Sequence, residues 1–381
     1  MQKTFDEVVL FARTGLNPRQ NFKLGQGNNY YITIKNIKNN SLVIDDNTDV
    51  VNDEAIKLIH KRSQIKKGDI LFASIGRMGD MYIIEEEPMV WDINESVFAF
   101  TLDTSIVRQK YFYYIFRVKS TLDYLASNSS GSTFKSIKMN QLKKMKFEIP
   151  ALDKQDQIVA VLDKICNIIE MRKQELGSLD DLIKARFVEM FDGKYPEDTL
   201  LNLCNIIDYR GKTPKKVERG LPFITAKNVK MHHMTLEPLE YISKETYDKV
   251  MVRGVPKEGD VVFTTEAPLG NVCRIPHFNT EFYIGQRIVT MQTEELNPTY
   301  LEYALSAEEF IRKYMGNSSG STVIGIRVRL LEQLTIQVPP RGLQDEFAIF
   351  VEQVDKSKVA VQKALDETQT LFDSLMQEYF G

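Results

Sequence analysis

The hexapeptide Asn-Ser-Ser-Gly-Ser-Thr occurs twice in this 381-residue chain, at Asn128–Thr133 and again at Asn317–Thr322. Each copy opens a longer repeat, because residues 128–191 align without a gap with residues 317–380, and 15 of the 64 aligned positions are identical. The identities after the hexapeptide are Ile137/Ile326, Leu142/Leu331, Pro150/Pro339, Gln155/Gln344, Asp156/Asp345, Leu176/Leu365, Leu182/Leu371, Glu189/Glu378 and Phe191/Phe380. Solenoid repeats have periods of roughly 20 to 50 residues, so this longer repeat indicates a duplicated domain with the segment that follows it.

The repeat also extends upstream of the hexapeptide. Thr14–Pro18 corresponds to Arg210–Pro214, Tyr31–Lys38 to Phe223–Lys230, and Gly68–Phe72 to Gly259–Phe263. The offset between copies falls from 196 to 192 to 191 and then to 189, which indicates small loop deletions within one plan. We therefore predict four segments, two large ones at 1–151 and 193–340 and two shorter ones at 152–192 and 341–381.

Each large segment has mostly the pattern of short β-strands. In the first copy, β-branched and aromatic runs bounded by Gly, Asn or Asp predict strands at 30–34, 70–75, 81–84, 97–101 and 146–149. One helix is expected over 111–126, and its counterpart should begin after an Asn297 cap with Pro298 in the first turn and end near 315. The fold class predicted is α+β, with two similar domains of about 150 residues each.

Each shorter segment shows a heptad pattern of apolar residues over about 40 positions, or roughly 60 Å of helix. The apolar positions are Ile158, Leu162, Ile165, Ile169, Leu176, Leu179 and Ile183 in the first copy and Phe347, Val351, Val354, Val361, Leu365, Phe372 and Leu375 in the second. A lone helix with one apolar stripe is unstable, so we predict that the two helices pair. If the two domains are related by a two-fold axis, the pair is an antiparallel coiled coil; the alternative is packing on the helix's own domain or on a second copy of the chain. Gly177 is the expected weak point of the first helix.

The composition is that of an ordinary globular protein, with 43% hydrophobic and 27% charged residues. Cys166, Cys204 and Cys273 are far apart and form no CxxC pair, so we expect reduced thiols in a cytoplasmic protein. The N-terminus lacks a signal-peptide pattern, and no apolar run approaches the roughly 18 residues of a membrane span, so no membrane association is expected.

The net charge of −3 is unevenly distributed along the chain. Counting Lys and Arg against Asp and Glu gives +4 for 1–151, −3 for 152–192, zero for 193–340 and −4 for 341–381. A nucleic-acid partner would therefore contact the two larger segments.

The motifs of common catalytic sites are absent. The chain has no phosphate-binding GxxxxGK[ST] loop, no GxGxxG after a strand, no HExxH and no GxSxG. Its four histidines (His60, His232, His233 and His277) have no partners at metal-ligand spacing. We therefore expect neither a catalytic site nor a metal or cofactor in this chain.

The repeated polar sites instead suggest binding to an anion. The Ser-Gly-Ser-Thr loops could expose backbone N–H groups to phosphate, and basic residues follow each loop. The alternative is a flexible turn beside a solvated strand. Lys35, Asn36 and Lys38 recur as Lys227, Asn228 and Lys230, residue types that contact phosphates and base edges, although a solvated strand edge is an equal contender. The turns 76–79 and 267–270 share only their final Gly, as loops that recognise two different sequences would.

The order of these motifs resembles the specificity (S) subunits of Type I restriction–modification systems. The resemblance covers the whole chain. It rests on Gly211–Pro214, Phe223–Lys230, Gly259–Phe263, Gln286-Arg287-Ile288 and the Gly-Ser-Thr loops. It also rests on Ile149–Gln155, which is similar to the Pro-Pro-Leu-x-x-Gln sequence with which a long helix starts in the family. It implies two target recognition domains, each contacting half of a bipartite DNA site. The candidate DNA-binding residues are Asn17, Lys35, Asn36, Lys38, Arg77, Ser132, Thr133, Lys135, Lys138, Lys212, Thr213, Lys215, Lys227, Asn228, Lys230, Gln286, Arg287, Ser321, Thr322 and Arg327.

The resemblance also implies partners for a non-catalytic, phage-defence DNA-binding subunit. These are double-stranded DNA, two methyltransferase (M) subunits carrying S-adenosylmethionine chemistry on adenine, and restriction (R) subunits, attached through M, that use ATP and Mg²⁺. The coiled coil would set the spacer between half-sites and dock the M subunits. Two alternatives stay open from the residues alone. One is a stand-alone metal-dependent nuclease, with Glu85-Glu86-Glu87 as its best carboxylate run; the other is a coiled-coil protein adaptor.

Overall fold

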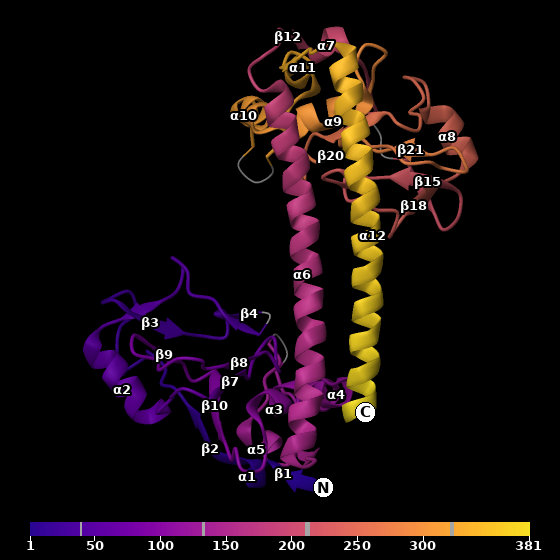
Figure 1. The fold of residues 1–381 in the computed structure, drawn as a ribbon. Helices are drawn as coiled ribbons and strands as arrows, with labels where there is room; N and C mark the ends of the chain where they lie inside the picture. Colours follow the sequence, from indigo (N-terminus) through magenta and orange to yellow (C-terminus); the bar gives the residue numbers. More distant parts are fainter. Residues whose placement is uncertain (39, 132–133, 210–213, 321–323) are drawn as a thin grey trace. The chain divides into compact units, whose positions relative to one another are not determined.

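The computed structural model describes residues 1–381 except 39, 132–133, 210–213 and 321–323. The chain divides into two compact units (Figure 1). Unit 1 consists of Met1–Met171 with Ala364–Gly381, and unit 2 is Arg172–Lys363. Each unit therefore contains one globular copy of the repeat and parts of both long helices. None of the described helices combines the length and the hydropathy required of a membrane span.

Unit 1 is built on a four-stranded antiparallel sheet in the order β2-β10-β7-β8. These strands are β2 (Val9–Thr14), β10 (Val97–Leu102), β7 (Ile70–Ala73) and β8 (Met81–Ile83). A second sheet has the order β6-β3-β9, with β3 (Asn29–Ile32) parallel to β9 (Trp91–Ile93) and antiparallel to β6 (Val50–Val51). Two further pairs are β1 (Gln2–Thr4) with β11 (Lys146–Glu148), and β4 (Ile37–Lys38) with β5 (Ser41–Leu42). Its short helices are α1 (Phe5–Val8), α2 (Asp53–Ser63), α3 (Gln109–Ile115), α4 (Lys119–Ser127) and α5 (Met139–Leu142).

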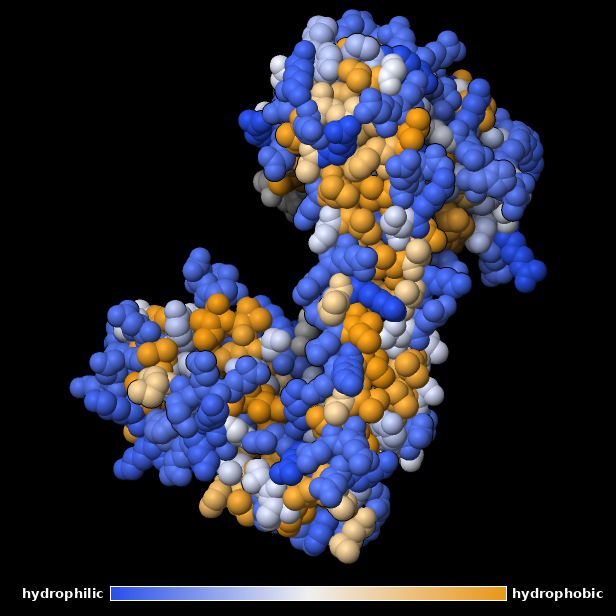
Figure 2. Space-filling model, in the orientation of Figure 1, coloured by the Kyte–Doolittle hydropathy of each residue, from blue (hydrophilic) through white to orange (hydrophobic). Residues whose placement is uncertain are grey.

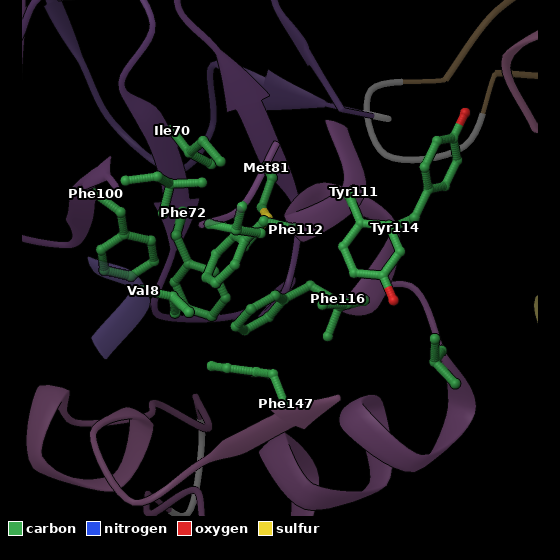
Figure 3. Close-up of a cluster of buried hydrophobic side chains, with 14 of the residues drawn as sticks. Val8, Ile70, Phe72, Met81, Phe100, Tyr111, Phe112, Tyr114, Phe116 and Phe147 are labelled. Carbon is green, nitrogen blue, oxygen red and sulfur yellow. The ribbon is translucent and has the colours of Figure 1, made fainter. Parts of the chain in front are cut away.

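The core of unit 1 is rich in aromatic rings that lie between the four-stranded sheet and helix α3 (Figure 3). Phe72 of β7 makes an edge contact with Phe116, with ring centroids 5.6 Å apart, and Phe112 contacts Phe147 of β11 at 5.5 Å. The single helix predicted over 111–126 is wrong, because the chain breaks into α3 and α4 around Val118, which is extended. This break lets Phe116 and Val118 both point into the core, which one straight helix would not allow.

Unit 2 repeats this plan. Its four-stranded antiparallel sheet has the order β13-β22-β19-β20, comprising β13 (Asn205–Asp208), β22 (Ile288–Gln292), β19 (Val261–Thr264) and β20 (Val272–Arg274). The second sheet has the order β14-β18-β15-β21, with β14 (Lys216–Val217), β18 (Glu240–Ile242), β15 (Leu221–Ile224) and the parallel neighbour of β15, β21 (Tyr283–Ile284). The remaining pairs are β12 (Glu197–Thr199) with β23 (Thr335–Gln337), and β16 (Val229–Lys230) with β17 (His233–Met234).

The helices of unit 2 also repeat the break seen in unit 1. They are α7 (Leu200–Leu203), α8 (Lys244–Val250), α9 (Pro298–Ser306), α10 (Glu308–Gly316) and α11 (Val328–Leu331). The predicted Asn297 cap is confirmed, because its side chain accepts a hydrogen bond from the Thr299 N–H and Pro298 opens α9. The predicted continuous run to 315 is wrong, since Ala307 is extended between α9 and α10. The break places Phe310 and Tyr314 against Phe263 of β19.

The two long helices are α6 (Leu152–Phe191) and α12 (Arg341–Phe380), both 40 residues long. Gly177 does not interrupt α6. The predicted apolar stripe is buried or half-buried along both helices. In unit 1, Ile158, Leu162, Ile165 and Ile169 share a core with Phe372.

Unit 2 contains the other part of each long helix. There, Arg186 Nη2 lies 3.1 Å from Glu346 and Lys358 Nζ lies 2.6 Å from Asp180. Ascending numbers on α6 thus pair with descending numbers on α12, so the helices run in opposite directions within this unit. Ile183 shares the core of unit 2 with Phe347, Val351 and Val354.

A buried glutamine fixes the start of each long helix. Gln155 is fully buried; its Oε1 accepts the Arg108 N–H at 2.8 Å, and its Nε2 donates to Ile106 and Pro150 carbonyls at 2.9 and 2.8 Å. Gln344 makes the equivalent contacts with the Asn297 N–H and the Pro339 carbonyl, both at 2.8 Å. Arg108 and Asn297 are the caps of α3 and α9. Each glutamine therefore joins a long helix to the globular part of its unit.

We expect Gln155→Ala and Gln344→Ala each to lower the free energy of unfolding by about 1–3 kcal/mol, because buried backbone groups lose their partners. Urea denaturation followed by hydrogen exchange of α3 and α9 measures the loss and assigns it to one unit. Gln157→Ala on α6 and Gln353→Ala on α12 are matched controls, since both side chains are exposed. Equal stability of the buried-site variants and the controls would contradict the assignment.

Candidate nucleic-acid interface

Three loops of unit 1 meet at one end of its four-stranded sheet. They are the segment after β3, of which the structure describes 33–38 and 40, the β7–β8 turn at 74–80, and the loop before α5, of which it describes 130–131 and 134–137. The Gly76 N–H donates to the Lys135 carbonyl at 3.1 Å, and Ser130 and Ser136 exchange backbone hydrogen bonds of 2.9 and 2.8 Å. Arg77 Nη2 donates to the Ile37 carbonyl at 3.0 Å, which joins the first loop to the turn. Basic residues that are far apart in the sequence therefore lie close together on these three loops.

The predicted basic residues of unit 1 lie on these loops with their side chains exposed. They are Lys35, Lys38, Arg77, Lys135 and Lys138. Lys38 lies 3.9 Å from Asp45, and Arg77 Nε lies 3.4 Å from Asp80. Burial raises the pKa of the Asp80 carboxyl above its usual range, while the positive charges of Arg77 and Arg117 oppose that rise. The surface combines exposed lysines with one guanidinium that is held by Asp80 and the Ile37 carbonyl.

The same loops meet in unit 2. The Ile326 N–H donates to the Thr265 carbonyl at 2.9 Å, as Ile137 does to Ser74 in unit 1. Glu266 and Gly325 form an isolated β-bridge between the β19–β20 turn and the loop before α11. The Asn271 side chain donates to the Val229 carbonyl at 2.8 Å and so attaches the β16–β17 hairpin. The loop framework is thus common to both units.

Different basic residues occupy this framework in unit 2. Lys215, Lys227, Arg287 and Arg327 are exposed, and Lys230 is half-buried. Arg287 Nε lies 3.0 Å from Glu266 Oε1, and its carbonyl accepts the Thr265 N–H at 2.9 Å. Arg327 caps α11 at the position that Lys138 has before α5. Gln286, next to Arg287, is half-buried.

Asn36 and Asn228 are structural residues, which argues against their predicted base contacts. Both are buried. Asn36 Oδ1 accepts from the Thr33 N–H and hydroxyl, and its Nδ2 donates to the Val43 carbonyl and the Thr48 hydroxyl. Asn228 repeats the pattern with Thr225, Thr235 and Pro238. The strand predicted over 30–34 ends at Ile32, and 33–36 is a turn, so strand alternation does not describe Lys35 and its neighbours.

The remaining candidates are less informative. Asn17 is half-buried and accepts a hydrogen bond from Asn21 Nδ2 through its backbone carbonyl at 2.9 Å. Six candidates lie outside the described residues, namely Ser132, Thr133, Lys212, Thr213, Ser321 and Thr322.

A polar anchor of the β16–β17 hairpin has no counterpart among the predicted site residues. His232, with φ of 61° at the turn of the hairpin, has its Nδ1 2.9 Å from Glu302 Oε1, and its ring stacks on Tyr303 at 4.3 Å. Glu302 is buried on α9 and also accepts from Arg274 Nε at 2.7 Å. This contact could not be predicted from the charge pattern, because 70 residues separate His232 from Glu302.

No donor cluster suited to a metal ion occurs among the residues that the structure describes. An open groove of about 920 Å³ in unit 1 is lined in part by α2 residues and by Glu87, Met89 and Trp91. Glu87 belongs to the Glu85–Glu87 run of the nuclease alternative, and Lys67 N–H donates to it at 3.3 Å. This run therefore gains no support as a metal site.

The comparison with protein families matches the model of the Type I restriction modification DNA specificity domain twice, over residues 2–180 and 197–368. The chain belongs to this family. Two specificity domains of mixed α/β content, the expectation drawn from the repeat, are thereby confirmed.

Two relatives are similar to this chain in sequence, and two solved structures are similar to it in fold. The putative MjaX specificity subunit of Methanocaldococcus jannaschii is 23% identical over 342 residues, covering 80% of this chain and 77% of that protein. A putative specificity subunit of Haemophilus influenzae is 32% identical over 104 residues, 27% of this chain and 26% of the relative. The crystal structure of the S subunit from M. genitalium has a TM-score of 0.55 at 15% identity, with 100% of this chain and 96% of that chain covered. A chain solved in work on complex assembly of the type I system has a TM-score of 0.59 at 16% identity, with 99% and 96% covered.

We expect His232→Ala to loosen the β16–β17 hairpin, because buried Glu302 loses one of its two partners. Loss of a hydrogen bond to a charged group costs about 1.5–3 kcal/mol, so the amides of residues 232 and 235 should exchange at least about tenfold faster. Hydrogen exchange read by mass spectrometry measures the change. His233→Ala is the matched control, since its ring is exposed and its Nδ1 lies 3.1 Å from the Met231 carbonyl in the same hairpin. Unchanged exchange in the His232 variant would show that the anchor does not hold the hairpin.

Proposed function

We propose that each unit recognises one half of a bipartite, asymmetric double-stranded DNA site through its three-loop surface. The observation that carries the proposal is that one loop framework occurs twice with different exposed side chains. Buried residues such as Asn36 and Asn228 are shared, whereas Arg77 and Arg287 occupy positions that differ between the copies. Two copies of one loop framework that carry different exposed side chains are suited to recognising two different DNA sequences. In this proposal, the recognition domains are residues 1–151 and 193–340.

We further infer that helices α6 and α12 act as an antiparallel coiled coil that sets the distance between the half-sites. The buried stripe, the opposite directions within unit 2 and the equal lengths of 40 residues support this role. Each helix contributes one part to each unit, so the helices are the chain's two connections between the units.

The long helices also carry the surface we assign to methyltransferase subunits. Large apolar side chains are exposed on them, including Met171 in unit 1 and Val188, Ile349 and Val359 in unit 2. Figure 2 shows hydrophobic residues along the helices and a mostly hydrophilic surface on the rest of each unit. Large patches of exposed apolar side chains are typical of protein interfaces. Two M subunits would bind here and bring S-adenosylmethionine chemistry to adenine, and R subunits, bound through M, would use ATP and Mg²⁺.

Methylome sequencing tests the proposed function. Cells that express this chain with its cognate methyltransferase subunit should carry methylated adenines in one motif made of two specific parts separated by a fixed unspecific spacer. Cells with the methyltransferase subunit alone are the control and should lack the motif. If both subunits are present and no bipartite motif appears, DNA recognition by this chain is refuted and an adaptor role is favoured.

The spacer role gives a separate prediction. Insertion of seven residues into α6 after Met171 and into α12 after Lys363 lengthens both helices by about 10 Å. Since base pairs are spaced by about 3.4 Å, the spacer of the methylated motif should lengthen by about three base pairs, with both specific parts unchanged. Replacement of seven residues at the same places, without a change in length, is the control. A motif with the original spacer in the lengthened variant would exclude the coiled coil as the ruler.

A further inference from the structure

We propose that Arg77 in unit 1 and Arg287 in unit 2 each recognise a guanine, one in each half-site. This inference rests on the proposed function and adds the identity of one base and one residue per half-site. It begins with the different ways in which the two units place an arginine on the same loop framework.

Arg77 is held from two sides while much of it stays accessible. Its Nε lies 3.4 Å from Asp80 in the same turn, and its Nη2 donates to the Ile37 carbonyl of the neighbouring loop at 3.0 Å. The side chain is nevertheless 52% exposed. The adjacent Gly76 N–H is bonded to the Lys135 carbonyl, so the turn itself is attached to the third loop. The guanidinium thus has a fixed direction before any ligand arrives.

Arg287 lies at the corresponding place in unit 2, although it belongs to a different element of the fold. It precedes β22, its carbonyl accepts the Thr265 N–H, and its Nε lies 3.0 Å from Glu266. Glu266 is itself bridged to Gly325 in the third loop. The Arg287 side chain is 51% exposed. Both units therefore present a carboxylate-held guanidinium where the turn meets the third loop.

The two arginines are not copies of each other. In the alignment of the two copies, Pro268 stands at the position of Arg77, and Ser96 stands at the position of Arg287. Ser96 and Arg287 nevertheless make the same backbone hydrogen bond. The Ser96 carbonyl accepts the Ser74 N–H, and the Arg287 carbonyl accepts the Thr265 N–H. Each unit thus has an arginine at this meeting point, but at a different position of the repeat, so duplication of one residue does not account for both.

The carboxylate partners favour a base over a phosphate as the ligand. Asp80 and Glu266 place negative charge beside each guanidinium, which weakens its attraction for an anionic phosphate. A neutral base edge suffers no such repulsion. In the major groove, guanine presents the acceptors O6 and N7, which match the forked donors of arginine, and this is the commonest specific contact of its kind. Holding the side chain in advance also reduces the entropy lost on binding.

The test compares the methylated motifs produced by the complex with wild-type chain, Arg77→Lys and Arg287→Lys. Lysine keeps the charge but cannot form the forked contact, so a role in charge alone predicts no change of motif. We expect a guanine in each half of the wild-type motif. Arg77→Lys should reduce the preference for guanine at one position of one half by roughly 5- to 150-fold, and Arg287→Lys should do so in the other half only.

Lys138→Ala is the matched control, because this exposed cation belongs to the same loop surface and is the N-cap residue of α5. It should lower methylation at all sites without relaxing any base. A wild-type bipartite motif that both lysine variants leave unchanged would overturn the inference while the proposed function stands. Relaxation of both halves by one variant would also overturn it, whereas the absence of any bipartite motif refutes the proposed function itself. Thermal melting of each variant chain identifies loss of folding, and Arg77→Ala and Arg287→Ala then repeat the comparison.

Discussion

A buried glutamine at the start of each long helix is the contact on which the rest of each unit depends. Gln155 and Gln344 occupy sites that exclude water, and each satisfies a helix-cap N–H and a carbonyl of the preceding proline segment. An aliphatic side chain in that place would leave these groups unpaired, at a cost that is large compared with the modest net stability of a domain. The direction in which each long helix leaves its globular part is set by these bonds. The sequence of loops elsewhere in the unit can change without disturbing this attachment.

The distribution of buried and exposed residues separates the frame from the surface. The Oδ1 atoms of Asn36 and Asn228 accept hydrogen bonds within the turn after β3 or β15, and their Nδ2 groups donate to the segment that follows. These repeated residues therefore hold the loops in shape. The exposed positions nearby differ between the copies, with Lys135 aligned to Ile324 and Arg77 to Pro268. The two asparagines, which are buried, are thus the same in both copies, while these exposed neighbours differ. A duplicated domain can acquire a second binding preference in this way without a new fold.

The sequence predicted the long helices and most core strands because both have strong apolar periodicity over several residues. The sequence did not predict the breaks at Val118 and Ala307, since helix-compatible residues on both sides conceal a turn that only packing of Phe116 or Phe310 requires. Helix α2 was missed although Asn52 caps it, two acidic residues open it and His60, Lys61 and Arg62 end it, a pattern that could have been recognised. For the candidate site, exposed basic residues could be predicted from their type. The burial of Asn36 and the His232–Glu302 contact could not, because both depend on loops distant in sequence.

The two units solve one physical problem with different residues. A loop surface that contacts DNA needs side chains that are exposed yet restrained, because a free arginine loses more conformational entropy on binding. Unit 1 restrains Arg77 with Asp80 and the Ile37 carbonyl, and unit 2 restrains Arg287 with Glu266. Unit 2 additionally fastens its hairpin to α9 through His232, whereas in unit 1 Asn40 Oδ1 accepts the Met81 N–H at the corresponding hairpin. Since these restraints differ, a substitution of Asp80, Glu266 or His232 has no equivalent in the other unit, and each surface can change independently of its copy.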